Sequence, residues 1–282
     1  MGIGRAPRAS LKPFVELVWA SDGAGAPPAA ARRELVLPTG MTHIVLRFGG
    51  SPLRLFADHG DRLGDTVGHA LIGGARAGPY LKALEPSAPS VGALLRPGAA
   101  ELMAGAPAGA LAGAHTRLED VWGDRAVSEL ADRLAGAASP AARLELFEAA
   151  LAARLPGLRG IDPLVAHALM RLGASWSVGE AVRETGVSHR HFARTFREAV
   201  GLGPKTWCRL TRFGAVLDRL AREPAISWAE LAVAEGYADQ SHFSREFRAF
   251  SGLTPGAYRR AAPVAPRHVP VSFVQDGTRA AG

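Results

Sequence analysis

The chain has 282 residues, of which 48% are hydrophobic and 21% charged, so it has room for about two buried cores and its composition excludes an intrinsically disordered protein. Its apolar runs fall short of the roughly 18 residues that a membrane-spanning helix needs, and we expect neither such a helix nor a secretory signal. The single cysteine, Cys208, excludes an internal disulfide and a cysteine zinc site, which suits a reducing cytoplasm.

Short apolar runs separated by glycine and proline fill the first hundred residues. The runs are ELVLPTG, THIVLRFGG, LRLFADHG, GHALIGGAR, PYLKALEP and SVGALLRPG, which begin at residues 34, 42, 53, 68, 79 and 90. Short strands at this spacing are typical of an antiparallel barrel or sandwich. The pattern therefore predicts a β-rich region over residues 1–97.

The pattern becomes helical over residues 98–157. Leu144, Phe147, Leu151 and Leu155 recur at helical spacing on one face, and a Pro-Gly pair follows them. We expect residues 1–157 to form one domain, with Trp19, Trp122 and Phe147 in its core. An alternative, that these aromatic side chains line an effector pocket, stays open.

A second helical block begins near residue 158 and runs to about residue 262. It carries 14 Lys and Arg against 10 Asp and Glu over residues 161–260, a mild basic excess. A proline-rich tail follows over residues 263–282, for which the sequence allows a loose strand or disorder. The predicted fold class is thus α+β, with an all-α second domain.

The second block repeats itself. Residues 191–207 match residues 242–258 at eight of seventeen positions, and the segments before them align as well. Each unit has a short helix, a turn with glycine and a second helix, which is the pattern of a helix-turn-helix. Gly186 and Gly236 are predicted to end the first helices, and Ser188 and Asp239 to cap the second ones.

The second helix of each unit has an apolar face and a polar face. Phe192, Phe196 and Val200 share one side, and Phe243, Phe247 and Phe250 do the same in the second unit. The opposite faces carry the residues that we assign to DNA contact: His189, Arg190, Ala193, Arg194 and Arg197 in the first helix, and Gln240, Ser241, Ser244, Arg245 and Arg248 in the second. Arginine can bridge a guanine or bind phosphate, and serine can bond to either.

A continuous helix is predicted between the two units. Trp207, Leu210, Phe213, Leu217 and Leu220 keep helical spacing in the segment that joins them. Such a helix would fix the separation of the two polar faces. Successive major grooves on one side of DNA lie about 34 Å apart.

Residues 161–260 resemble the AraC/XylS family of bacterial transcription regulators. The resemblance rests on GVSHRHFARTFREAVGLGPKTW in the first unit and GYADQSHFSREFRAFSGLTPGAYRR in the second. Residues 1–157 resemble a sensor domain of some members through VLPTGMTHIVLRFG, VGALLRPGAAELMAGAP and LEDVWGD. The resemblance implies a cytoplasmic, nucleoid-associated regulator that binds promoter DNA, with RNA polymerase, a homodimer partner and a small-molecule effector as further candidates.

No catalytic motif, cofactor fingerprint or metal-ligand pattern stands out. His189 and His191 are two apart on a helix and so point to different faces, and His43, His59 and His69 show no ligand pairing. We therefore predict no enzyme activity, no cofactor, no metal and no membrane partner. Two alternatives remain open for the first domain, a module that binds a partner protein and a fused alkyl-transfer enzyme, although a single thiol argues against the latter.

Overall fold

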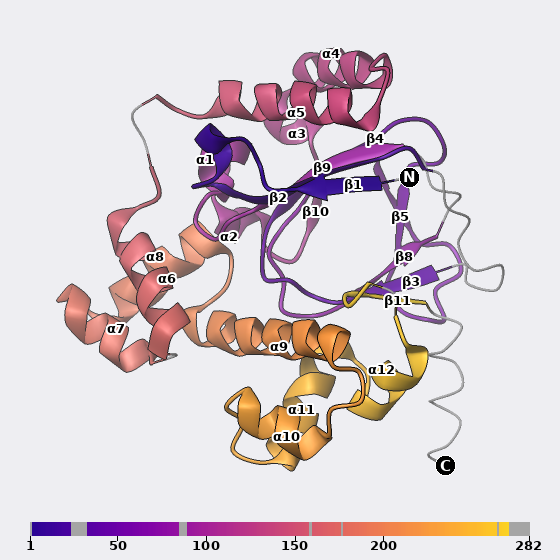
Figure 1. The fold of residues 1–282 in the computed structure, drawn as a ribbon. Helices are drawn as coiled ribbons and strands as arrows, with labels where there is room; N and C mark the ends of the chain where they lie inside the picture. Colours follow the sequence, from indigo (N-terminus) through magenta and orange to yellow (C-terminus); the bar gives the residue numbers. More distant parts are fainter. Residues whose placement is uncertain are drawn as a thin grey trace.

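The computed structural model describes residues 2–23, 33–84, 89–157, 160–175, 177–263 and 265–270. Within these residues, strands gather in the first part of the chain and helices in the second (Figure 1). The strands pair into two antiparallel sheets, stacked as a sandwich that does not close into a barrel. The predicted α+β class, with a β-rich first part and an all-α second part, is confirmed.

The first sheet has the strand order β1-β2-β9-β4-β7-β10. Its strands are β1 (Gly2–Arg5), β2 (Val15–Ser21), β9 (Ser90–Leu95), β4 (His43–Arg47), β7 (Ala70–Gly73) and β10 (His115–Arg117). The second sheet has the order β11-β3-β8-β5-β6. Its strands are β11 (His268–Pro270), β3 (Arg33–Val36), β8 (Tyr80–Ala83), β5 (Leu53–Phe56) and β6 (Asp65–Gly68).

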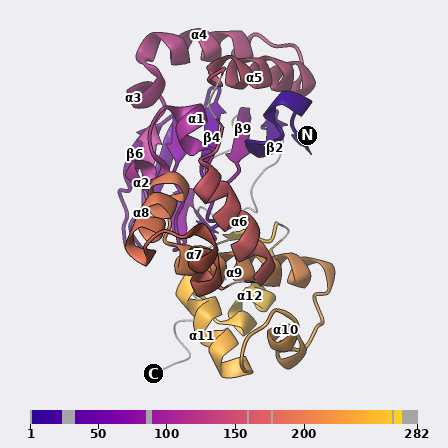
Figure 2. The same ribbon diagram turned by 90° about the vertical axis from the view of Figure 1, so that its left-hand side faces the viewer.

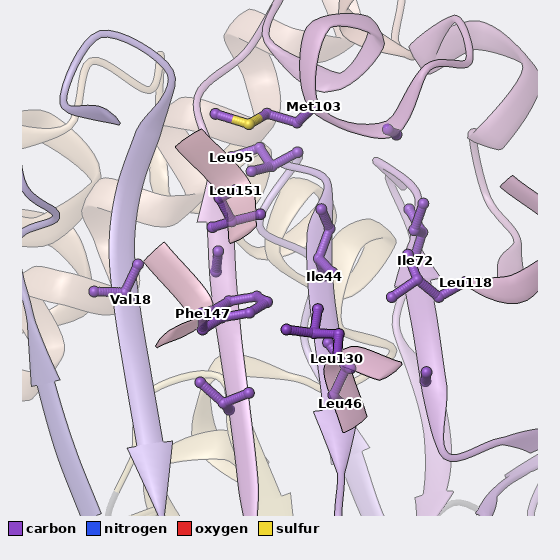
Figure 3. Close-up of a cluster of buried hydrophobic side chains, with 14 of the residues drawn as sticks. Val18, Ile44, Leu46, Ile72, Leu95, Met103, Leu118, Leu130, Phe147 and Leu151 are labelled. Carbon is purple, nitrogen blue, oxygen red and sulfur yellow. The ribbon is translucent and has the colours of Figure 1, made fainter. Parts of the chain in front are cut away.

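Helices cover the outer face of the first sheet. They are the 3-10 turn η1 (Ala9–Leu11) and helices α1 (Ala100–Ala104), α2 (Ala108–Leu111), α3 (Glu119–Trp122), α4 (Asp124–Ala135) and α5 (Pro140–Arg154). Figure 3 shows Leu130, Phe147 and Leu151 over the sheet, among strand residues such as Leu46 and Leu95. All of these side chains are buried, so the first apolar core lies between this sheet and helices α4 and α5.

One expectation for this region needs correction. Residues 98–157 are not wholly helical, because β10 pairs with β7 at the edge of the first sheet. In the tail, for which the sequence allowed a loose strand or disorder, residues 268–270 form the strand β11, which pairs with β3 through the register of His268 with Val36. Three-residue strands carry too little alternation to be recognised in a sequence, and their partners decide their conformation. Residues 271–282 of the tail lie outside the described residues.

The second half holds two helical units around one long helix. The first unit contains α6 (Pro163–Ser175), α7 (Val178–Thr185) and α8 (His189–Val200). The connecting helix is α9 (Pro204–Arg222), and the second unit contains α10 (Trp228–Ala234), α11 (Gln240–Ser251) and α12 (Pro255–Ala261). The predicted continuous linker helix is therefore confirmed, with Leu210, Phe213, Leu217 and Leu220 buried along it.

The two halves of the chain share an apolar core. Leu35, Leu37 and Leu81 of the second sheet and its flanking residues belong to the same buried cluster as Leu210 and Phe213 of α9. Helix α2 also lies against α8, as Figures 1 and 2 show from two sides. The sandwich and the helical units are consequently in direct contact and not joined by a linker alone. None of the described helices is long and apolar enough to cross a membrane.

Candidate DNA-binding surface

Glycine and short polar residues set the turns that orient the two repeated helices. Gly186 and Gly236 have φ values of 67° and 71°, in the left-handed region that side chains disfavour. Ser188 Oγ accepts a hydrogen bond from the His191 amide at 3.3 Å, and Asp239 Oδ1 accepts one from the His242 amide at 2.6 Å. The predicted helix ends and caps are confirmed, and they define where α8 and α11 begin.

The apolar faces of α8 and α11 point inward as predicted. Phe192, Phe196 and Val200 are buried in the core of the first unit, with Cys208 of α9 beside them. Burial raises the pKa of Cys208 to about 11, so its thiol stays protonated at neutral pH. The corresponding phenylalanines of α11 are buried in the shared core. This packing leaves one side of each helix on the molecular surface.

The residues assigned to DNA contact lie on that outer side. His189, Arg190, Arg194 and Arg197 are exposed on α8, and Ala193 between them is half-buried. On α11, the exposed residues are Gln240, Ser241, Arg245 and Arg248, and Ser244 is half-buried. The Ser244 hydroxyl donates to the Gln240 carbonyl oxygen at 2.8 Å within the same helix. Each helix thus presents a basic strip to solvent.

Arg194 and Arg245 are the central cations of the two strips. Within the described part of the chain, neither forms an ion pair with a carboxylate. The charge of Arg245 does act on Asp239, whose pKa is lowered mainly by the hydrogen bond from the His242 amide and to a smaller extent by Arg245. An arginine at such a position can instead form a structural salt bridge to the preceding helix, but Arg194 and Arg245 have no carboxylate partner among these residues, and both side chains are exposed.

Two ion-pair clusters that the sequence did not reveal hold the units together. Arg209 of α9 donates from Nε and Nη2 to the two carboxylate oxygens of Glu246 in α11, both at 2.7 Å. In the first unit, Glu184 of α7 receives Arg171 at 2.6 Å and His167 at 3.1 Å from α6. Each cluster links one helix to another, so charge spacing within a single helix gives no signal of it.

The histidines of the first domain do not assemble as metal ligands. His43 points between the two sheets, whereas His59 and His69 are exposed on loops and strand ends. Among the described residues, no group of three or more His, Cys, Asp or Glu side chains is arranged to hold a metal ion.

Comparison with known proteins assigns the second half to a class. Residues 181–261 match the family described as "Helix-turn-helix domain", which covers α8, α9, α11 and most of the two units. Residues 5–117 match a "Domain of unknown function (DUF6597)", which covers most of the sandwich. The class that the fold and the surface define is a helix-turn-helix protein with an amino-terminal β-sandwich.

The relatives specify the type of helix-turn-helix. A protein of Streptomyces antibioticus described as an AraC-like transcription regulator is 36% identical over 42% of this chain and 39% of its own length. A regulator of the same description from Streptomyces lividans is 35% identical over the same shares. The chain spans about two fifths of these relatives. Over this segment the chain is similar to AraC-like regulators, and the resemblance drawn for residues 161–260 is confirmed.

Solved structures match this chain at low sequence identity and low TM-score. ToxT from Vibrio cholerae is 10% identical, with a TM-score of 0.43, over 82% of this chain and 96% of that one. The carboxy-terminal domain of AraT, a response regulator from Geobacillus stearothermophilus, is 20% identical, with a TM-score of 0.33, over 36% of this chain and 88% of that one.

Proposed function

We propose that this protein is a transcription regulator that binds promoter DNA with α8 and α11 in successive major grooves. The observation that carries the proposal is the pair of exposed basic strips on α8 and α11, which both pack against one continuous helix, α9. In this proposal His189, Arg190, Gln240 and Ser241 read base edges at the amino-terminal ends of the helices. The remaining residues of each strip contact bases or phosphates.

The domain division that we propose follows from this role. Residues 158–262 form the DNA-binding part and residues 1–157 a sensing or dimerising part, with RNA polymerase and a second copy as candidate protein partners. The two parts pack directly against each other, so a change of structure in the sandwich would shift the side chains that contact α9. This packing supports the transmission of a signal from the sandwich to the DNA-binding part. A protein that acts on promoter DNA works in the cytoplasm at the nucleoid, and we assign it no catalytic role or cofactor.

The experiment is selection of binding sites from a pool of random DNA duplexes by the full-length protein. The selected sequences should contain two conserved blocks about one helical turn apart, because α9 holds the two strips at a fixed distance. Affinity for the selected duplex should fall about a thousandfold between 50 and 200 mM salt if about six phosphates are contacted. Failure to enrich any sequence, or an affinity independent of salt, would contradict the proposal.

A control variant separates the strips from general surface charge. Arg125 lies on α4, far from the helical units, with 93% of its side chain exposed. Arg125→Gln should leave both the selected sequence and the salt dependence unchanged. A loss equal to that of a variant in either strip would mean that overall positive charge, and not the strips, causes binding.

A further inference from the structure

The chain returns to the sandwich after the last helix of the second unit. Strand β11 follows α12 and lies at the edge of the second sheet, beside β3. Figure 1 shows this segment in yellow, running from α12 to β3. The ladder continues past β11, because the Leu37 amide donates to the Arg267 carbonyl oxygen at 2.8 Å. We call residues 265–270 the strap, since they join the second helical unit to the sandwich.

On the sandwich side, the strap has one apolar and one charged anchor. Val269 is fully buried in the shared core that also contains Leu35 of β3. His268 Nδ1 lies 3.0 Å from Glu34 Oε2, which Lys82 Nζ also approaches to 2.8 Å. Although burial acts to raise the pKa of Glu34, the bonds from His268 and Lys82 outweigh it and lower this pKa to about 2. Glu34 is therefore a carboxylate at neutral pH, and it holds the strap against β3.

On the other side, the strap contacts α9 and α12 of the DNA-binding part. The Tyr258 hydroxyl of α12 donates to the Pro266 carbonyl oxygen at 2.7 Å. Arg267 Nη1 donates to Asp218 Oδ1 of α9 at 3.0 Å. The Tyr258 ring in turn meets the Phe247 ring edge-on, with centroids 5.5 Å apart. Phe247 lies on the buried face of α11, so a single side chain connects the strap to the second recognition helix.

The chain leaves α12 through a disfavoured backbone conformation. Ala262 has a φ of 41° and is, within the described part of the chain, the one residue other than glycine with a positive φ. Such conformations persist only where the surrounding structure holds them. Strand β11 has three residues, so few ladder bonds keep it in place. A short edge strand that begins near a strained residue can separate from its sheet while the rest of the protein stays folded.

The sandwich thus contacts both helical units, the first through α2 against α8 and the second through the strap. Both basic strips are exposed while the strap is paired with β3, so the paired state leaves the DNA-binding surface open. The effect of the strap is to limit the movement of the second unit relative to the sandwich and to the first unit. An element that is held in place before binding loses less freedom when it binds.

We propose that the strap is a conformational device with a paired and a released state. In the paired state it holds α11 in its DNA-binding orientation, and its release from β3 loosens the second unit and weakens DNA binding. This inference rests on the proposed function for its effect on DNA. The hold of the strap on the second unit can be measured without DNA.

The first test releases the strap in the full-length protein. Val269→Asp puts a carboxylate into the apolar core, and withdrawal of the strap into solvent is the least costly response. This variant should bind the selected DNA duplex on the order of tenfold more weakly than the wild-type protein. Leu63→Asp, the same type of change at a side chain that is 83% exposed, should bind it like the wild-type protein. Unchanged affinity of a folded Val269→Asp protein would overturn the proposal.

The second test fixes the strap covalently and does not depend on how Val269→Asp folds. Val36 and His268 lie opposite each other next to the bonded pair of Leu37 and Arg267, so theirs is a non-hydrogen-bonded pair with closely spaced side chains. Val36→Cys combined with His268→Cys should form a disulfide there. The oxidised protein should bind the duplex on the order of tenfold more tightly than the reduced one, which lacks the histidine anchor. Equal or weaker binding after oxidation would overturn the proposal.

Amide hydrogen exchange without DNA distinguishes this inference from the proposed function. In Val269→Asp the amides of α11 and α12 should exchange on the order of tenfold faster than in the wild-type protein. Those of α6 and α7, which pack in the separate core of the first unit, should not change. If exchange responds in this way but the wild-type protein selects no DNA, the proposed function fails and the hold of the strap on α11 stands. If the protein selects DNA and exchange in α11 and α12 is unchanged, the strap fails and the proposed function stands.

Discussion

The Arg209 guanidinium and the Glu246 carboxylate form a two-point ion pair between the linker helix and the second recognition helix. The Arg209 guanidinium also lies 5.3 Å from the centroid of the Phe250 ring, a cation–π contact that adds to the link between the two helices. It lies beside the basic strip of α11 and fixes the rotation of that helix about its own axis. Orientation of α11 thus depends on a residue in α9, outside the helix-turn-helix turn itself.

Glu246→Gln should lower the free energy of unfolding by about 1 kcal/mol at pH 7, because it removes charge from a partly exposed pair while keeping its shape. Arg209 lowers the pKa of Glu246, so this contribution exists above about pH 4.5 and is lost as the pH falls. Denaturant unfolding of Glu246→Gln measures this contribution. The control is Glu198→Gln, which alters an exposed glutamate of α8. Equal values for the two variants would show that the pair does not stabilise the unit.

Phe243 is fully buried at the centre of the second unit, where its ring contacts Trp228, Tyr237 and Phe247. Phe243→Ala should lower the free energy of unfolding by about 3–5 kcal/mol through the cavity it leaves. Val233→Ala in the same unit should cost less than about 0.5 kcal/mol, since that side chain is 77% exposed. Chemical denaturation compares them, and a Phe243→Ala protein as stable as the control would refute the inward face of α11.

Gly201 tests the contact between the sandwich and the first recognition helix. It ends α8 with φ 86°, and a methyl group there would lie 3.1 Å from the Ala108 carbonyl oxygen and 3.1 Å from Ala75 Cβ. Gly186 ends α7 with φ 67°, and a methyl group there would have no neighbour within 4 Å. In both alanine variants the left-handed backbone conformation should lower the free energy of unfolding by about 1–2 kcal/mol. Only Gly201→Ala also strains the domain contact.

The melting temperature of Gly201→Ala should therefore fall below that of Gly186→Ala. Ala108 belongs to α2, so the difference between the two variants reports how tightly α2 packs on the end of α8. If the two variants have the same melting temperature, the contact between α2 and α8 adjusts to the added methyl group without loss of stability. A rigid mechanical connection between the sandwich and α8 would then be excluded.

The histidines between the sheets predict acid sensitivity. Burial, followed by the positive charge of Arg76, lowers the pKa of His43 to about 4 and that of His115 to about 3. The unfolded chain binds these protons near pH 6.5 and the folded chain does not, so stability is complete above that pH and is lost below it. From pH 7 to pH 5 the loss should be about 2 kcal/mol for each histidine.

Urea unfolding at the two pH values measures this loss. His43→Gln should lose less stability on acidification than the wild-type protein, and His59→Gln, which alters an exposed histidine, should match the wild-type protein. An acid response that is the same in all three proteins would show that His43 does not remain neutral in the folded state.

The recognition helices were predictable because several independent signals agree there. The glycine turns, the caps and the spacing of Phe192, Phe196 and Val200 all act within one helical unit, where local rules decide the structure. The domain junction could not be predicted in this way. Leu202 and Leu210 are apolar in the sequence whether they fill their own unit or meet the sandwich, and the structure places them in the shared core.

The sandwich shows the same division. Strands that form apolar runs between glycine and proline, such as β4 and β7, were recognised, whereas β1 and β10 depend on partners that the sequence does not specify. The polar cluster between the sheets was invisible for a related reason. His43, Arg76 and His115 are spread over more than seventy residues, and only the pairing of β4, β7 and β10 brings them together.

Alanine variants of Arg245 and Arg194 can distinguish a contact with a base from a contact with a phosphate. If Arg245 bridges a guanine, Arg245→Ala should weaken binding of the selected duplex by about 1–3 kcal/mol and relax the preference at one base pair. A phosphate contact would weaken binding equally on every sequence. A structural role would lower the melting temperature, which we expect to stay unchanged because the side chain is exposed.

Binding to a library of duplexes, together with melting of the same proteins, distinguishes these outcomes. Arg194→Ala should relax a different base pair, about one helical turn from the first, because α9 joins the two units as one continuous helix. Ser241→Ala offers a milder neighbouring change on α11 that should act on the same half of the site as Arg245→Ala. If Arg194→Ala and Arg245→Ala relax the same base pair, the two helices do not occupy successive grooves, and the proposed arrangement on DNA is wrong.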